Sequence, residues 1–143
     1  MAAVGAITQT LSVLPQQGQR KDKLKLTLAW TSHTDSTVSG ISTDDGTFMG
    51  QAITKNLIGK ELVYGECTPG ATTPSDLYDV DILDANSVDL FSGGFDDCSN
   101  SATKAAYPFN GIAYGSRIVT GALTPSITAA GSGKTGTIVL LFE

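Results

Sequence analysis

A strict alternation of apolar and polar side chains over residues 23–31 constrains the fold of this chain more than any other feature of its sequence. In this run, KLKLTLAWT, one side carries Leu24, Leu26, Leu28 and Trp30, and the other carries lysine and threonine. A period of two residues is typical of a β-strand with one buried and one solvated face. The sequence therefore predicts a sheet that covers an apolar core on one side.

Other short runs repeat this pattern, and turn residues separate them. The run TGTIVLLF near the end is the most hydrophobic, which predicts a central strand, whereas residues 51–62 fit a short helix or a strand equally well. Many short strands with little or no helix favour an all-β fold, an antiparallel, jelly-roll-like β-sandwich. Further strands are predicted at residues 6–14, 60–68, 77–83, 88–91, 116–123, 126–130 and 136–142, with 77–83 and 88–91 forming a hairpin.

The length of 143 residues predicts one domain. Residues 1–20 alternate less strictly and are interrupted by Pro15, so we interpret them as an edge strand or a detachable interaction arm. Residues 21–143 are then the single sandwich domain.

Charge is unevenly distributed along the chain, which carries a net charge of −5. This acidic balance argues against nucleic acid or an anionic membrane as the main partner. Seven of the fourteen acidic residues lie between Asp76 and Asp97, with no basic residue among them. Pairing of the basic stretch of one copy with the acidic segment of another is one interpretation, and two solvated faces are the other. The basic stretch consists of Arg20, Lys21, Lys23 and Lys25.

The acidic segment is also the strongest candidate for chemistry. Asp79 and Asp81 are two residues apart on a predicted strand, so their carboxylates point the same way. Such a pair suits incidental Ca²⁺ binding or acid–base work, but a solvated strand face that discourages edge pairing is the simpler interpretation. We predict no catalytic residue, no cofactor and no metal site.

Two other motifs resemble catalytic or nucleotide sites without completing them. The segment AAGSGKTG resembles a phosphate-binding loop, but Thr128 stands where its first glycine belongs and a strand follows it. We therefore interpret residues 131–134 as a hairpin turn. His33 is the only histidine, and its neighbours Ser32 and Asp35 are too close in sequence to predict a triad.

Cys67 and Cys98 lack the spacing of a zinc site, and two buried free thiols are favoured over a disulfide. The beginning of the chain does not match a signal peptide, and no apolar run reaches the length of a membrane span. These observations predict a protein that is made in a cytoplasm and stays soluble.

The order of motifs in residues 24–143 resembles small structural proteins of tailed-bacteriophage particles. Those proteins commonly have glycine after the Asp-Ala-Asn turn, where this chain has Ser87. The closest resemblance is to capsid decoration, or cement, proteins. The motifs are LTLAWTS at 26–32, TPSDLYDV at 73–80, DAN at 84–86, VDL at 88–90, Pro108, NG at 110–111, GALT at 121–124, AG at 130–131 and VLLF at 139–142.

The resemblance implies a non-enzymatic virion protein, assembled in the bacterial host cytoplasm, that binds the major capsid protein and its own copies. A tail, neck or baseplate adaptor, a head fibre and a carbohydrate- or receptor-binding sandwich are the alternatives. Because aromatic side chains are enriched at interfaces, those of residues 92–114 are candidate anchors, with ordinary core packing as the other interpretation. They are Phe95, Tyr107, Phe109 and Tyr114.

Overall fold

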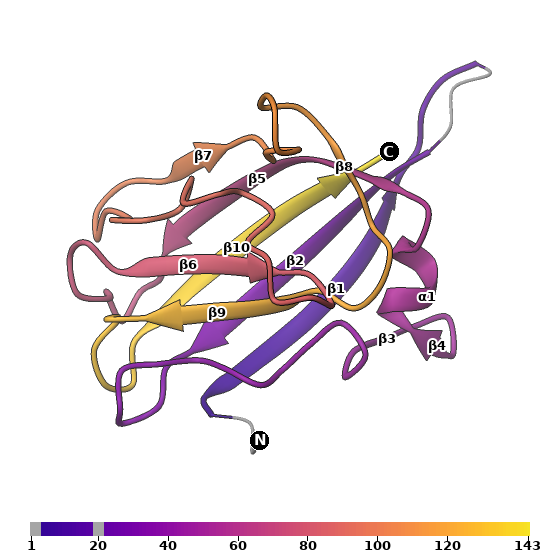
Figure 1. The fold of residues 1–143 in the computed structure, drawn as a ribbon. Coiled ribbons are helices and arrows are strands. Elements are labelled where there is room, and N and C mark those ends of the chain that lie inside the picture. The colour runs from indigo at the N-terminus through magenta and orange to yellow at the C-terminus, as the bar shows by residue number, and fades with distance from the viewer. Residues whose placement is uncertain (1–3, 19–21) are drawn as a thin grey trace.

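The computed structural model describes residues 4–18 and 22–143 and shows two packed layers of antiparallel strands (Figure 1). This confirms the predicted all-β sandwich. One layer is a six-stranded sheet in the order β1-β2-β10-β5-β7, with β8 also paired to β5. Its strands are β1 (Ala6–Leu14), β2 (Lys23–Thr31), β5 (Glu61–Pro69), β7 (Lys104–Ala106), β8 (Arg117–Ile118) and β10 (Thr135–Phe142).

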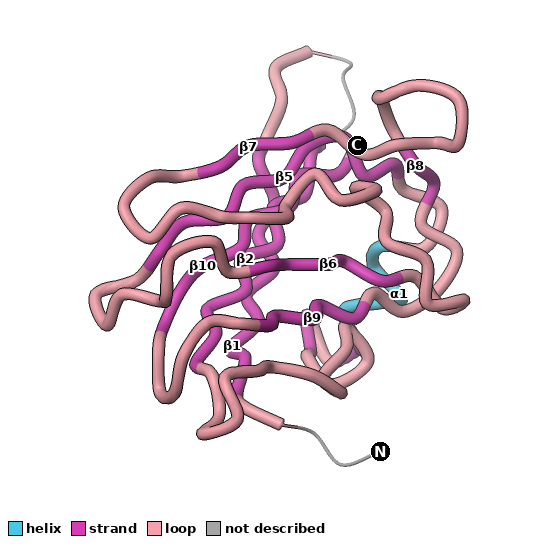
Figure 2. Tube along the Cα trace, turned by 60° about the vertical axis from the view of Figure 1, so that its left-hand side comes forward, coloured by secondary structure: helices cyan, strands magenta, loops and turns pink. Residues whose placement is uncertain are grey.

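The second layer is smaller and lies across one face of this sheet (Figures 1 and 2). Its strands are β6 (Asp79–Leu83) and β9 (Thr124–Thr128), which pair with each other. A short hairpin of β3 (Thr47–Phe48) and β4 (Gln51–Ala52) leads into the one-turn helix α1 (Ile53–Leu57). The ambiguous segment 51–62 is therefore strand, helix and the beginning of β5 in turn.

The core lies between the layers and is built by the predicted alternation. Leu24, Leu26, Leu28 and Trp30 of β2 are all buried. β10 occupies the centre of the large sheet, as its hydrophobicity predicts, and pairs with β2 on one side and β5 on the other. On the opposite layer Val80 and Ile82 of β6 are buried, as is Tyr78 just before it, and the centre of the Tyr78 ring lies 5.7 Å from that of Trp30.

Residues 1–20 were predicted to be an edge strand or an arm. β1 lies at the end of the large sheet and pairs with β2 over nine consecutive residues without a register shift. Leu11 of β1 is buried in the core. The described part of this segment is therefore an edge strand that contributes to the core.

The predicted hairpin of residues 77–83 and 88–91 is wrong in its second strand. β6 pairs with β9 instead, and only a single bridge joins Leu83 to Asp89. The Asp89 carboxylate accepts hydrogen bonds from the backbone N–H groups of Ile82 (3.2 Å), Phe91 (3.2 Å) and Gly93 (2.8 Å). These bonds curl the chain into turns, so Phe91 enters the core from a loop.

Two other predictions need correction. Residues 131–134 are a turn between the layers, not a hairpin turn, because β9 and β10 belong to different sheets. Gly131 and Gly133 have φ values of 87° and 63°, which explains the two glycines. The predicted strand at 116–123 is reduced to the two residues of β8. In addition, β7 is a strand that was not among those predicted.

Candidate interaction surfaces

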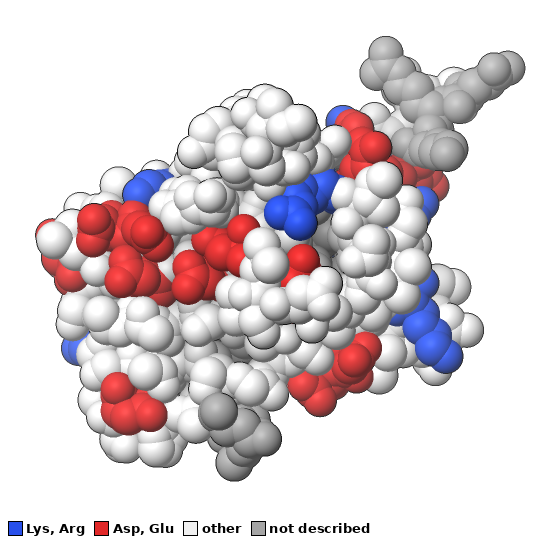
Figure 3. Space-filling model, in the orientation of Figure 1, with Lys and Arg blue, Asp and Glu red and all other residues white. Residues whose placement is uncertain are grey.

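The acidic segment gathers on the outer side of the smaller layer, over β6 (Figure 3). Several of its carboxylates accept hydrogen bonds from the backbone, and Asp84 also lies 3.8 Å from the Arg117 guanidinium. The Asp84 side chain accepts from the N–H groups of Asn86 (2.8 Å) and Val88 (3.0 Å), and Asp79 accepts from that of Asp97 (2.8 Å). Aspartates that fold turns in this way account for the acidic composition of this segment.

Asp79 and Asp81 are half-buried on the outward side of β6, as the alternation predicts. Partial burial, together with the neighbouring carboxylates of Asp89 and Asp96, raises the pKa of Asp81. Within residues 4–18 and 22–143 no group of three or more metal-ligating side chains converges. The acidic surface therefore shows mutual repulsion and no assembled cation site.

The described residues of the basic stretch, Lys23 and Lys25, lie on the other layer of the molecule. Lys23 and Lys25 alternate with buried leucines on β2, so they project from the face of the large sheet that turns away from the core. Lys23 Nζ pairs with Glu143 Oε1 at 2.8 Å. Arg20 and Lys21 lie outside the described residues. The lysines and the acidic segment thus occupy opposite layers.

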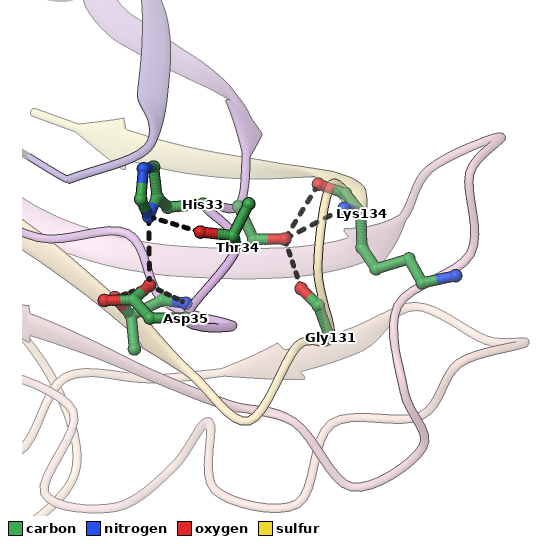
Figure 4. A network of polar contacts seen from close by, with 7 residues as sticks. His33, Thr34, Asp35, Gly131 and Lys134 are labelled. Atoms are coloured by element: carbon green, nitrogen blue, oxygen red, sulfur yellow. Dashed lines mark hydrogen bonds and ion pairs between the residues drawn. The ribbon is translucent and has the colours of Figure 1, made fainter.

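Ser32, next to His33 in the chain, has a structural role (Figure 4). Ser32 is buried, and its hydroxyl donates to the Gly131 carbonyl (2.5 Å) and accepts from the Lys134 amide (2.9 Å). The exposed His33 ring lies 3.7 Å from Asp35, whose pKa is lowered mainly by the Thr37 hydroxyl. This serine hydroxyl is committed to fixing the 131–134 turn, not to activation by the histidine.

Cys67 and Cys98 are buried free thiols, as predicted. Their side chains contact each other in the core, and burial raises the pKa of Cys67. The Cys98 thiol also donates to the Phe95 carbonyl at 3.1 Å. A thiol held in its protonated form within the core is a poor nucleophile.

Exposed apolar side chains concentrate on the loop of residues 107–116, which joins β7 to β8. This 107–116 loop stands clear of the sheet above β5 (orange in Figure 1). Ile112 is 92% exposed, Tyr114 66% and Tyr107 59%. Ile118 of β8 and Ile58 after α1 are also exposed. Exposed apolar side chains that form a contiguous patch mark interaction sites, and the 107–116 loop brings three of them together.

The 107–116 loop is held in one shape by its own contacts. The Asn110 side-chain oxygen accepts from the N–H groups of Ile112 and Ala113, both at 3.0 Å. Arg117 donates to the Phe109 carbonyl at 3.1 Å, and the Phe109 and Tyr114 ring centres lie 5.1 Å apart. Such preorganisation lowers the entropy that binding would cost.

The candidate aromatic anchors divide between core and surface. Phe95 is fully buried, with its ring centre 4.6 Å from that of Phe91, so it belongs to the core and not to an interface. Tyr107 and Tyr114 are exposed, and Phe109 of the same loop is half-buried. Sequence reasoning missed Ile112, the most exposed of all, although the Asn-Gly pair before it is a turn signal.

An open cleft of about 460 Å³ lies beside Ile58, where the C-terminal residue meets the beginning of β5. Lys60, Glu61 and Glu143 line it, and the backbones of Glu61 and Glu143 are hydrogen-bonded to each other. It contains no histidine, cysteine or hydroxyl side chain, and its form is that of a surface groove between strand ends.

No protein-family model matches this chain, and no curated protein or solved structure shows significant similarity to it. Within the described part of the chain, no helix is long and apolar enough to cross a membrane.

Proposed function

We propose that this chain is a non-enzymatic virion structural protein that decorates the capsid, binds the major capsid protein and stabilises the shell. The observation that supports it best is the preorganised 107–116 loop, which presents Ile112 and Tyr114 to solvent. The motif order that resembles decoration proteins supplies the identity of the partner.

The role needs binding and no reaction. Two of the polar groups that the sequence analysis weighed for chemistry have structural tasks, because Ser32 fixes a turn and Asp79 binds the Asp97 amide. Insertion of Ile112 and Tyr114 between capsomers would bury apolar surface that is now in water. Many copies on one shell would let individually weak contacts act together.

The test is rebinding to particles that lack this protein, prepared from the phage whose genome encodes it. We expect the wild-type protein to bind at a copy number near that of the capsid protein, measured by densitometry of purified particles. Ile112→Asp should lower binding at least about tenfold, since it places a charge in the contact. The matched control is Met49→Asp, because Met49 is 85% exposed on the β3–β4 turn, and it should bind normally.

Two results would contradict the proposal. Binding at a small fraction of the capsid copy number would favour a tail, neck or baseplate adaptor instead. Equal binding by Ile112→Asp and the wild-type protein would remove the 107–116 loop from the contact.

A further inference from the structure

No other described strand or helix covers the face of the large sheet that turns away from the core (Figures 1 and 2). We call it the outer face. The strand registers place its side chains in rows that cross the strands. Its three central rows are Thr8, Ala29, Thr137 and Thr68; Thr10, Thr27, Val139, Glu66 and Ala105; and Ser12, Lys25, Leu141 and Tyr64.

The outer face carries little charge for a solvated sheet. Only Lys25 and Glu66 are charged among these thirteen residues, and the rest are hydroxyl, aliphatic or tyrosine side chains. At one end of the sheet Lys23 is neutralised by Glu143. Core regions of protein interfaces are depleted of charge in the same way.

We propose that two copies of this chain form a dimer by packing their outer faces together around a two-fold axis that crosses β10. This inference goes beyond the decoration role and rests on residues other than those of the 107–116 loop, which meets the outer face where the Tyr107 ring centre lies 5.7 Å from that of Tyr64. It is tested on the purified protein without particles, so its failure and that of the proposed function are separate results.

The positions of Lys25 and Glu66 are the reason for proposing a second copy of this chain as the partner. Lys25 and Glu66 lie on either side of β10, about 10 Å apart across the sheet and about 7 Å apart along it. A two-fold axis that lies in the interface plane and bisects the line between them at a right angle places Lys25 of each copy over Glu66 of the other. An isologous interface requires this reciprocity. Lys25 has no ion-pair partner among the described residues, so its ammonium group is available.

The size of the outer face suits a small interface. Four strands about 4.8 Å apart and about 27 Å long, with the three-residue β7 beside them, cover roughly 570 Å² per copy, or about 1,100 Å² for the pair. A specific interface needs about 1,000 Å² of combined surface with good complementarity. The acidic segment lies on the opposite layer, so its net charge does not face the partner.

Sedimentation equilibrium of the full chain over a concentration series tests this dimer. The wild-type protein should dimerise, and Val139→Lys should be monomeric, because it places two lysines of the pair near the axis. The matched control is Val88→Lys, on an exposed turn beside the smaller layer, which should remain dimeric. Circular dichroism melts show whether each variant is folded.

Charge reversal tests the axis itself and does not depend on Val139. Lys25→Glu and Glu66→Lys should each weaken dimerisation about tenfold or more, since each creates two like-charge contacts. The double variant should regain most of the affinity. A monomeric wild-type protein, or a dimeric Val139→Lys, would overturn the dimer, and a double variant as weak as the singles would overturn the assigned axis.

Discussion

Gly136 and Trp30 show how a single residue sets the packing of this core. They are register partners on β10 and β2, and a Cβ atom on Gly136 would lie 2.3 Å from the Trp30 ring. We expect Gly136→Ala to lower the free energy of unfolding by about 1–3 kcal/mol, because the central strand has no room to move away from the ring. Urea unfolding measures this.

Gly115→Ala is the control for that measurement. A Cβ atom there has no heavy atom within 4 Å, and the backbone φ of Gly115 is not positive. Equal losses for the two variants would show that glycine removal itself, and not contact with Trp30, determines the result.

Asp81 gives a prediction that depends on pH. Its pKa is raised by partial burial and by nearby carboxylates, so its ionisation opposes folding. The contribution of Asp81 to the free energy of unfolding is therefore most favourable when its carboxyl group is protonated. This contribution falls as the pH rises through the pKa of Asp81 in the folded protein. We expect Asp81→Asn to stabilise the protein at neutral pH and to have no such effect below about pH 3.9, where the unfolded carboxyl is also protonated.

Thermal melts of both proteins across this pH range provide the check. Asp44→Asn, which alters an exposed carboxylate on the 42–46 turn, should leave the melting temperature unchanged at each pH. A stabilisation by Asp81→Asn that persists at acid pH would contradict the electrostatic explanation.

Asp89 organises the element that the sequence did not predict. Its carboxylate accepts from three backbone N–H groups and so holds residues 89–93 as turns instead of a strand. Asp89→Ala leaves those donors without their partner, and we expect a loss of about 1–3 kcal/mol in the free energy of unfolding. Asp44→Ala, which removes no such bond, should cost little in the same denaturant titration.

β1 is the element whose role the sequence left open. Leu11 is only 5% exposed, whereas Val13 on the same strand is 41% exposed. We expect Leu11→Ala to lower the free energy of unfolding by about 2 kcal/mol, near the low end for buried leucines because an edge strand can partly collapse. Val13→Ala should cost clearly less, and equal stability of Leu11→Ala and wild type would identify β1 as an arm.

The alternation of apolar and polar residues correctly predicted the strands that bury one face along their whole length. β2 has the bounds that its pattern predicts, and β10 lies at the centre as its hydrophobicity indicates. Residues 88–91 were predicted as a strand for their apolar character, yet Leu90 and Phe91 enter the core from turns and Val88 is exposed. The difference comes from side-chain bonds to the backbone at Asp89, which an apolar pattern does not contain.

The candidate surfaces were predictable to a smaller extent, for a similar reason. Tyr107 and Tyr114 were predicted as anchors and are exposed, but Phe95, chosen by the same criterion, lies against Phe91 in the core. The exposure of Ile112 depends on the turn that Asn110 closes. The outer face arises only from the pairing of strands that are distant in sequence.

For the whole molecule, the position of charge decides between two modes of self-association. The sequence suggests pairing of a basic stretch with an acidic segment of another copy. Lys25 and the acidic segment lie on opposite layers, so repeated contacts of that kind would stack copies without closing. Packing of two outer faces closes after two copies, which suits the proposed decoration role.

The two proposed surfaces together predict bivalent attachment. The 107–116 loop meets the outer face at Tyr107, whose ring centre lies 5.7 Å from that of Tyr64, but Ile112 and Tyr114 are not residues of that face, so a dimer would still present these two side chains of each copy. We expect the Val139→Lys monomer to bind particles about 10²-fold more weakly than the dimer, although its loop is unchanged. Adding Ile112→Asp should abolish the remaining binding in titrations of labelled protein against particles. Equal affinities of the monomer and the dimer would show that only one loop of a pair reaches the shell.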